Sequence, residues 1–210
     1  MHSNYRMLCL TVVFLQRLHD NEALSRAHAE SSNVVHVYCF DPHWFGSTHF
    51  GFPKTGPHRA RFLLESIVSL RHALETRGSQ LLLRCGKASS VIPALAKETG
   101  ATAVYAQQEV CSEELAIDAA VQHKLSKLPG APPLHQVWGG TMYDLRDLPF
   151  DPATDIQDVF TAFRKVVEKN CEVRAPLPGP GVQEGPRWRP RAYAPLPPPP
   201  PRTPPPLGRT

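Results

Sequence analysis

Five short apolar runs, separated by stretches of helical or loop character, constrain the fold of this 210-residue chain more than any other feature. Each run is rich in β-branched or aromatic residues, as the buried strands of parallel sheets are. An alternation of strands and helices predicts right-handed βαβ units whose helices cover both faces of the sheet. We therefore expect an α/β fold with a doubly wound, five-stranded parallel sheet of order 3-2-1-4-5, its strands at residues 7–15, 34–40, 80–84, 103–107 and 134–138.

Three segments have the pattern of amphipathic helices. In residues 58–77 apolar residues recur at helical spacing, and Gly78 can end the helix in the left-handed conformation. A second helix is expected after Cys111, because Ser112 and the two acids that follow suit the positive end of a helix dipole. A third, at residues 156–168, has an apolar stripe too wide for a solvated helix, so we expect it to dock on the sheet or on a domain that follows.

Composition divides the chain at about residue 174. Residues 175–210 hold 14 of the 23 prolines and five arginines against one acid, Glu184, so their net charge equals the +4 of the whole chain. A segment so poor in apolar residues is expected to be a disordered Pro/Arg-rich tail. Residues 1–174 carry no net charge and are numerous enough for one well-buried domain. The basic character therefore belongs to the tail and not to the body.

The cysteines and the N-terminal segment indicate the cellular compartment in which the protein is expected. The five cysteines are scattered, with no CxxC pair, which favours reduced thiols in an intracellular, reducing compartment. The run at 7–15 follows Arg6 and resembles a secretory signal, but the polar stretch between it and Ala-His-Ala at 27–29 is too long for a cleavage region. The run is also too short to span a bilayer. We expect a first core strand there, with neither secretion nor membrane insertion.

Residues 41–58 form a long segment dense in glycine, proline and aromatic residues, which is typical of a functional or interface loop. It is not a phosphate-binding loop, because GFPKTG lacks the Lys-Ser/Thr that ends a P-loop, and no GxGxxG follows the first run. His43 and His49 have no carboxylate or cysteine at ligand spacing beside them. Cys111 precedes a helix but has no identifiable base. We therefore expect no metal site and no catalytic residue.

Glu109 is the strongest candidate for a binding residue. It lies in YAQQEVCSEE (105–114), where a buried strand gives way to a helix. In open α/β sheets, ligands bind at the carboxyl ends of the strands, in the crevice beside the switch point. The alternative is a surface acid that interacts only with the helix dipole.

Four separated segments of the chain carry a resemblance to a known family. They are RLHDNEAL (17–24), VYCFDPHWFGSTHFGFPKTGPHRARFLLES (37–66), YAQQEVCSEE (105–114) and WGGTMYDLRDLPFDPATDIQDVFTAFRKVVE (138–168). In the same order, these segments resemble the N-terminal α/β domain of the DASH-type cryptochromes in the photolyase/cryptochrome family. The FGFPKTG and DLPF…FRK stretches are the part of the likeness that is specific to this branch, and the likeness covers about residues 17–174.

The resemblance implies a Rossmann-like domain that is followed, in family members, by a larger helical domain holding FAD and the DNA lesion. DASH members are associated with light-driven repair of pyrimidine dimers, mainly in single-stranded DNA, and many carry 5,10-methenyltetrahydrofolate as an antenna. Glu109 falls where the family places the carboxylate that binds the pterin of that antenna. Gln108, beside it, is expected to be a second polar contact.

Two departures from the family limit what is expected of this polypeptide. VVFLQRLHDN stands where the family reads much like WFRNDLRLHDN, so one wall of the antenna pocket is altered. After Arg174 the proline-rich segment stands where the helical domain would begin, and the chain looks like a truncated or alternatively spliced product. We expect weak folate binding at most, with no FAD, no photolyase activity and no DNA binding through the missing domain.

Two other hypotheses remain open. The chain could be a partner-binding module that uses the helix at 156–168 and the tail, in which Pro197–Arg202 fits PxxPx(Arg) and could dock an SH3-like groove. The arginine-bearing tail could also retain salt-sensitive nucleic-acid binding. Against both, proline- and arginine-rich sequence is common low-complexity material.

Overall fold

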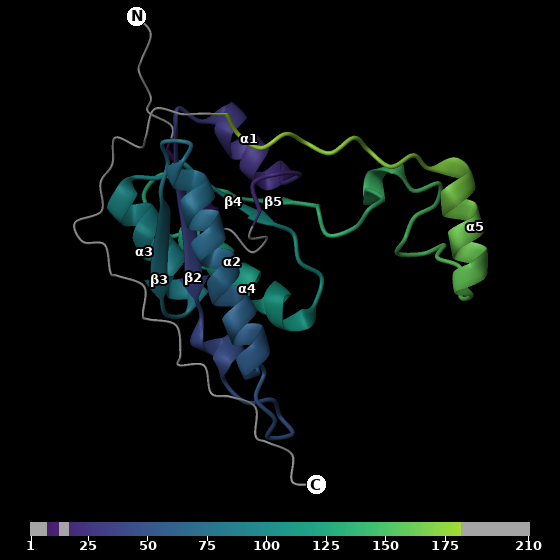
Figure 1. The fold of residues 1–210 in the computed structure, drawn as a ribbon, viewed down its shortest axis with the longest axis horizontal. Helices are drawn as coiled ribbons and strands as arrows, with labels where there is room; N and C mark the ends of the chain where they lie inside the picture. Colours follow the sequence, from purple (N-terminus) through teal and green to yellow (C-terminus); the bar gives the residue numbers. More distant parts are fainter. Residues whose placement is uncertain (1–7, 13–16, 182–210) are drawn as a thin grey trace, which may run out of the picture.

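The structure is a computed structural model that describes residues 8–12 and 17–181 (Figure 1). The expected SH3 ligand at Pro197–Arg202 and the ends of the apolar run at 7–15 lie outside these residues. The elements, in chain order, are β1 (Leu8–Val12), α1 (Glu22–Glu30), β2 (Asn33–Phe40), the 3-10 helix η1 (Pro42–Phe45), α2 (Pro57–Glu75), β3 (Leu81–Cys85), α3 (Ala88–Thr99), β4 (Ala103–Gln107), α4 (Ser112–Leu125), β5 (Leu134–Val137), the 3-10 helix η2 (Leu145–Asp147) and α5 (Phe160–Asn170).

The strands form one parallel sheet in the order β3-β2-β1-β4-β5. In the centre, Leu10 of β1 is paired with Val35 of β2 on one side and with Val104 of β4 on the other. The chain adds strands on one side of β1 and then on the other, so the switch point lies between β1 and β4. The predicted α/β class is confirmed.

Helices cover both faces of this sheet, because successive side chains of a strand point to opposite faces and both sets are apolar. The core on one face joins β2, β3 and β4 to α3 and α4 and includes Val35, Val37, Leu82, Ile92, Val104, Val121 and Leu125. The core on the other face joins β3 to α1 and α2 and includes Leu24, Ile67, Leu70, Leu74 and Leu81. Residues 8–12 and 17–137 are called the sheet body below.

Helix α2 follows its sequence pattern closely. It begins at Pro57, which suits a first helical position because the missing N–H would have had no partner there. Ile67, Leu70 and Leu74 are buried, as their spacing predicts. Gly78 follows the helix with a φ of +74°, in the left-handed region that favours glycine.

Helix α5 differs from its prediction. It begins at Phe160 and not at residue 156, and it stands apart from the sheet (Figure 1). Val167 is its buried residue, and the ring of Phe163 contacts Phe150 in the preceding loop. The alternative in which the stripe docks on the sheet is therefore wrong, whereas docking on a domain that follows stays a prediction. In this structure α5 packs on its own preceding loop, which leaves Val159 and Phe160 exposed. Residues 144–174 are called the α5 lobe.

After α5 the chain returns to the sheet body. The N–H of Asp20 donates to the carbonyl of Leu177 (2.8 Å), and the N–H of Leu177 donates to Asp20 Oδ1 (3.3 Å). Asp20 has a φ of +53°, unusual for a residue other than glycine, and Arg17 donates to its carbonyl at 2.8 Å. Gly179 lies against Leu18. Packed chain thus continues past residue 174, into the first residues assigned to the tail.

Candidate functional site

Glu109 lies at the carboxyl edge of the sheet, in the short turn between β4 and α4. The turn is held in place because the N–H of Gln108 donates to the carbonyl of Val137 at the end of β5 (2.8 Å). Cys111 occupies the N-cap position of α4 without a side-chain hydrogen bond, and Glu113 and Glu114 occupy the first turn, where acids suit the helix dipole. The local sequence therefore fixes the backbone from which Glu109 projects.

A cavity of about 360 Å³ opens at this edge. Its walls come from the end of β2, the segment around η1, the first turns of α2 and the turn after β4. The lining residues are Tyr38, Cys39, Asp41, Trp44, Phe45, Thr55, Arg59, Phe62, Leu63, Glu109 and Glu114. Glu109 is thus at a cavity, as its position predicts, whereas Gln108 is exposed and is not among the lining residues.

The carboxylate of Glu109 is in an unfavourable setting for a charge. Its pKa is raised, first because partial burial desolvates the carboxylate and then because Glu114 and Asp118 are also negative. Burial likewise raises the pKa of Asp118, although a hydrogen bond from Gln136 at 2.7 Å opposes the shift. Within residues 8–12 and 17–181, no group donates a hydrogen bond to the Glu109 carboxylate. A ligand with hydrogen-bond donors would relieve this cost.

The segment that forms the opposite wall is fixed by two buried or half-buried polar groups. Asp41 is buried and accepts hydrogen bonds from the N–H of His43 (2.9 Å) and the N–H of Ala88 (2.7 Å). Lys54 donates to both carboxylate oxygens of Glu113, at 2.7 and 2.9 Å, and its Nζ lies 5.7 Å from the centre of the Trp44 ring. The loop is thereby tied to α3 and to the start of α4, so the cavity is largely pre-formed.

Other residues at the cavity were not singled out from the sequence. Arg59 projects from the first turn of α2 and is the cation of the lining set. Burial raises the pKa of Tyr38 to about 12, so its hydroxyl remains a neutral donor at neutral pH. Trp44, Phe45 and Phe62 supply aromatic surface. The loop composition marked the region, but no spacing rule pointed to these individual side chains.

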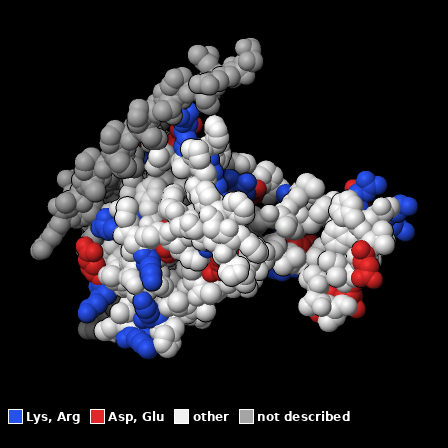
Figure 2. All heavy atoms as spheres, turned by 90° about the horizontal axis from the view of Figure 1, so that it is seen from below, with Lys and Arg blue, Asp and Glu red and all other residues white. Residues whose placement is uncertain are grey.

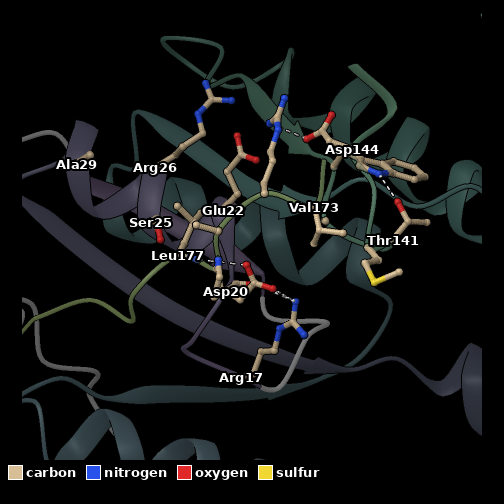
Figure 3. A pocket seen from close by; sticks show the side chains of 16 residues that line it. Arg17, Asp20, Glu22, Ser25, Arg26, Ala29, Thr141, Asp144, Val173 and Leu177 are labelled. Atoms are coloured by element: carbon tan, nitrogen blue, oxygen red, sulfur yellow. Dashed lines mark hydrogen bonds and ion pairs between the residues drawn. The ribbon is translucent and has the colours of Figure 1, made fainter. Parts of the chain in front are cut away.

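A second and larger cavity, of about 690 Å³, lies between α1, the loop after β5 and the returning segment at 173–177 (Figure 3). Glu22, Ser25, Arg26 and Ala29 line it from one face of α1, at spacings of three and four residues. Trp138 lines the cavity from the loop after β5, and its indole N–H donates to the hydroxyl of Thr141 at 2.9 Å.

An ion-pair network adjoins this second cavity through three of its lining residues, Glu22, Asp144 and Arg174. Arg174 pairs with Asp144 at 2.9 Å (Figure 3). Arg174 also pairs with Asp147 at 2.5 Å, and Arg146 pairs with Asp144 and with Glu22 of α1. Hydrogen bonds from Arg146, helped by the nearby charge of Arg174, lower the pKa of Asp144 to about 2. The acids of this cavity are thus neutralised by protein cations, in contrast to Glu109.

The other residues that were considered from the sequence, His43, His49 and Cys111, do not line either of these two cavities. His43 contacts Glu113 at 3.2 Å, and His49 is exposed in the loop. No group of three or more ligands that could hold a metal occurs within the described residues. Cys111 is exposed, and it and Cys39, Cys85 and Cys171 are free thiols. In the described part of the chain, no helix is both long enough and apolar enough to cross a membrane.

The family model described as DNA photolyase matches residues 16–181, which include both cavities. The chain belongs to the DNA photolyase family. Cryptochrome DASH, chloroplastic/mitochondrial, from Arabidopsis thaliana is 46% identical over 160 residues, covering 76% of this chain and 28% of that protein. Cryptochrome DASH from Xenopus laevis is 44% identical over 180 residues, covering 80% and 34%.

The fold agrees with this membership. The crystal structure of a Synechocystis sp. PCC6803 cryptochrome matches with a TM-score of 0.82 at 35% identity, covering 90% of this chain and 39% of that chain. The predicted resemblance to DASH-type cryptochromes is confirmed by these relatives. The chain spans about a third of their length.

Proposed function

We propose that this chain is an antenna-binding α/β domain of the DASH branch, and that its cavity beside Glu109 binds the pterin of 5,10-methenyltetrahydrofolate. The observation that carries the proposal is the Glu109 carboxylate itself. It is partly desolvated, its pKa is raised, and it lines a cavity at the switch-point edge of the sheet. Glu109 thus has unused acceptor capacity at a place where open α/β sheets bind ligands.

A pterin edge is chemically suited to this carboxylate. Its adjacent N–H groups can donate two hydrogen bonds to one ionised carboxylate, and such charge-assisted pairs are stronger than neutral ones. Binding would stabilise the charged form of Glu109, which the neighbouring Glu114 and Asp118 disfavour. Binding therefore removes part of the free-energy cost that the ionised Glu109 carboxylate imposes on the unliganded protein.

The other walls fit the rest of such a ligand. Trp44, Phe45 and Phe62 offer aromatic faces to a flat ring system. Arg59 offers a guanidinium to the carboxylates of the glutamate part of the cofactor. The cavity of about 360 Å³ is at the small end for a ligand site, so the ring would be enclosed while the glutamate part extends over the opening. When bound, methenyltetrahydrofolate supplies absorption of near-ultraviolet light.

The proposal is tested by titrating the full chain with 5,10-methenyltetrahydrofolate, by absorbance and by calorimetry. Glu109→Gln keeps the shape of the side chain but removes the charge, so we expect at least about a tenfold loss of affinity, the size of a charge-assisted hydrogen bond. Glu65→Gln is the matched control, because Glu65 is an exposed acid of α2 outside the lining residues. Equal affinities for wild type and Glu109→Gln would refute the site.

A fragment of the cofactor tests the contributions of Arg59 and Glu109 to binding separately. p-Aminobenzoylglutamate lacks the pterin, so its weak binding should be reduced by Arg59→Gln and unchanged by Glu109→Gln. Binding of the fragment that Arg59→Gln leaves unchanged would mean that the acidic end of the ligand lies away from Arg59.

A further inference from the structure

The most exposed apolar surface of the α5 lobe is gathered at the start of α5. Ile156, Val159 and Phe160 are 55%, 63% and 72% exposed, and they lie within five consecutive residues. Phe163 and Val167, further along the helix, face the lobe itself. Exposed apolar side chains that cluster in this way mark an interaction surface more often than single ones do. Ile156, Val159 and Phe160 are called the α5 patch.

Charges of opposite sign flank the α5 patch along the chain. Asp155 and Asp158 lie beside it on the N-terminal side, and Arg164 lies one helical turn after Phe160, on the same side of the helix. Arg164 has Glu168 as a partner, but the two groups are 3.8 Å apart and more than half exposed, so the pair is weak. In Figure 2 the lobe is the part on the right, where blue and red atoms form separate groups with white atoms between them.

This arrangement is self-complementary under a two-fold axis. If a second lobe lies antiparallel on the first, each α5 patch covers the other, and Arg164 of each copy faces Asp158 of the other. A parallel arrangement would instead bring acid against acid and base against base. A two-fold interface uses the same surface on both subunits, as this one would.

We propose that the α5 patch is the contact surface of a homodimer, in which two copies of α5 lie antiparallel and are oriented by two symmetric Asp158–Arg164 ion pairs. The occupant of the patch is thus a second copy of this chain. The patch holds three apolar side chains per copy, so the association is reversible and depends on protein concentration.

Sedimentation of the full chain over a range of concentrations tests this proposal. Wild type should shift, as concentration rises, from the chain mass of 23.3 kDa to twice that mass and no further. Phe160→Glu places a charge in the centre of the patch and should weaken association at least about tenfold. All variants are at exposed positions, so circular dichroism should show unchanged folding.

Charge reversal gives the decisive comparison. Asp158→Arg alone and Arg164→Asp alone each create two repulsive contacts, so each variant should be monomeric where wild type dimerises. An equal mixture of the two variants should dimerise again, because each arginine at 158 then meets an acid at 164. Lys165→Asp is the control, because Lys165 is about 100° round the helix from Arg164 and should leave dimerisation unchanged.

Four outcomes would overturn the proposal. A wild-type chain that stays monomeric at every concentration would mean that the patch binds another molecule or none. Association that survives Phe160→Glu, or a mixture that behaves like its separate components, would mean that the contact lies elsewhere. Growth beyond the dimer would mean that the interface is not two-fold.

Discussion

In the sheet body, Ile67 and Val104 have no exposed surface, whereas Phe160, in the α5 lobe, is 72% exposed. The body is held by apolar side chains from both faces of a sheet. The lobe has one buried residue in its helix and depends on the ion pairs of Arg174 and Arg146. The body therefore depends mainly on buried apolar surface and the lobe mainly on exposed ion pairs, so the two regions should differ in their sensitivity to mutation, pH and salt.

The largest expected effect is on the core of the body. Ile67→Ala should lower the free energy of unfolding by about 2–5 kcal/mol, because it leaves a cavity at a fully buried position. Phe160→Ala, a larger truncation in the lobe, should change it by less than about 0.5 kcal/mol. Urea denaturation followed by circular dichroism measures both. A similar loss for the two variants would remove the distinction between body and lobe.

Acid should destabilise the body through His36. Burial, with a smaller contribution from the nearby His28, lowers the pKa of His36 from 6.5 to about 3. The unfolded chain therefore takes up a proton first, so stability is complete above pH 6.5 and falls by about 1.4 kcal/mol per pH unit between 6.5 and 3. Unfolding measured at several pH values gives the slope. His36→Val should flatten the curve in this range, and an unchanged slope would assign it to other groups.

The lobe should respond to salt where the body does not. Arg174→Gln should weaken the lobe only slightly and locally, because exposed ion pairs contribute little and are screened. Hydrogen exchange should then be faster in residues 138–181 and unchanged in β1–β5. High salt should have the same effect on wild type. Lys165→Gln is the control, since Lys165 is exposed and lies outside both the network and the α5 patch.

The smallest effect is expected at Glu109. Because its pKa is raised, the ionised carboxylate disfavours the folded state above its unfolded pKa, and the cost disappears as pH falls. Glu109→Gln should therefore stabilise the chain at neutral pH by about 0.5 kcal/mol, after allowance for screening by solvent. The same variant should lose folate binding, and wild-type affinity should decline in acid at a pH above that of an ordinary glutamate. A destabilised Glu109→Gln would show that the carboxylate has a structural role.

The sequence predicted the α/β class because its strands are buried on both faces and therefore read as continuous apolar runs. It also placed Glu109 at the correct edge, because the position of a residue after a strand fixes the edge of a parallel sheet to which it belongs. The other residues of the cavity walls could not be predicted from the sequence. Arg59 and Tyr38 line the same cavity as Glu109 because of tertiary folding, and no local sequence pattern indicates that they do.

The α5 lobe could be predicted least. The stripe in residues 156–168 indicated a helix, but periodicity does not say what covers an apolar face, and here the preceding loop covers part of it. The contacts that bring the chain back to the body join residues far apart in sequence. Asp20 and Leu177 are separated by 157 positions, and a single aspartate after a histidine gives no sign of such a partner.

The bond between Asp20 and Leu177 also sets an order of events during synthesis. Asp20 leaves the ribosome long before Leu177 is made, and at translation rates of about 5–20 residues per second the interval is roughly 8–30 s. The strands can assemble within this interval, but the larger cavity gains its third wall only when the segment at 173–177 arrives. The nascent chain therefore completes its α/β layers first and this recess last.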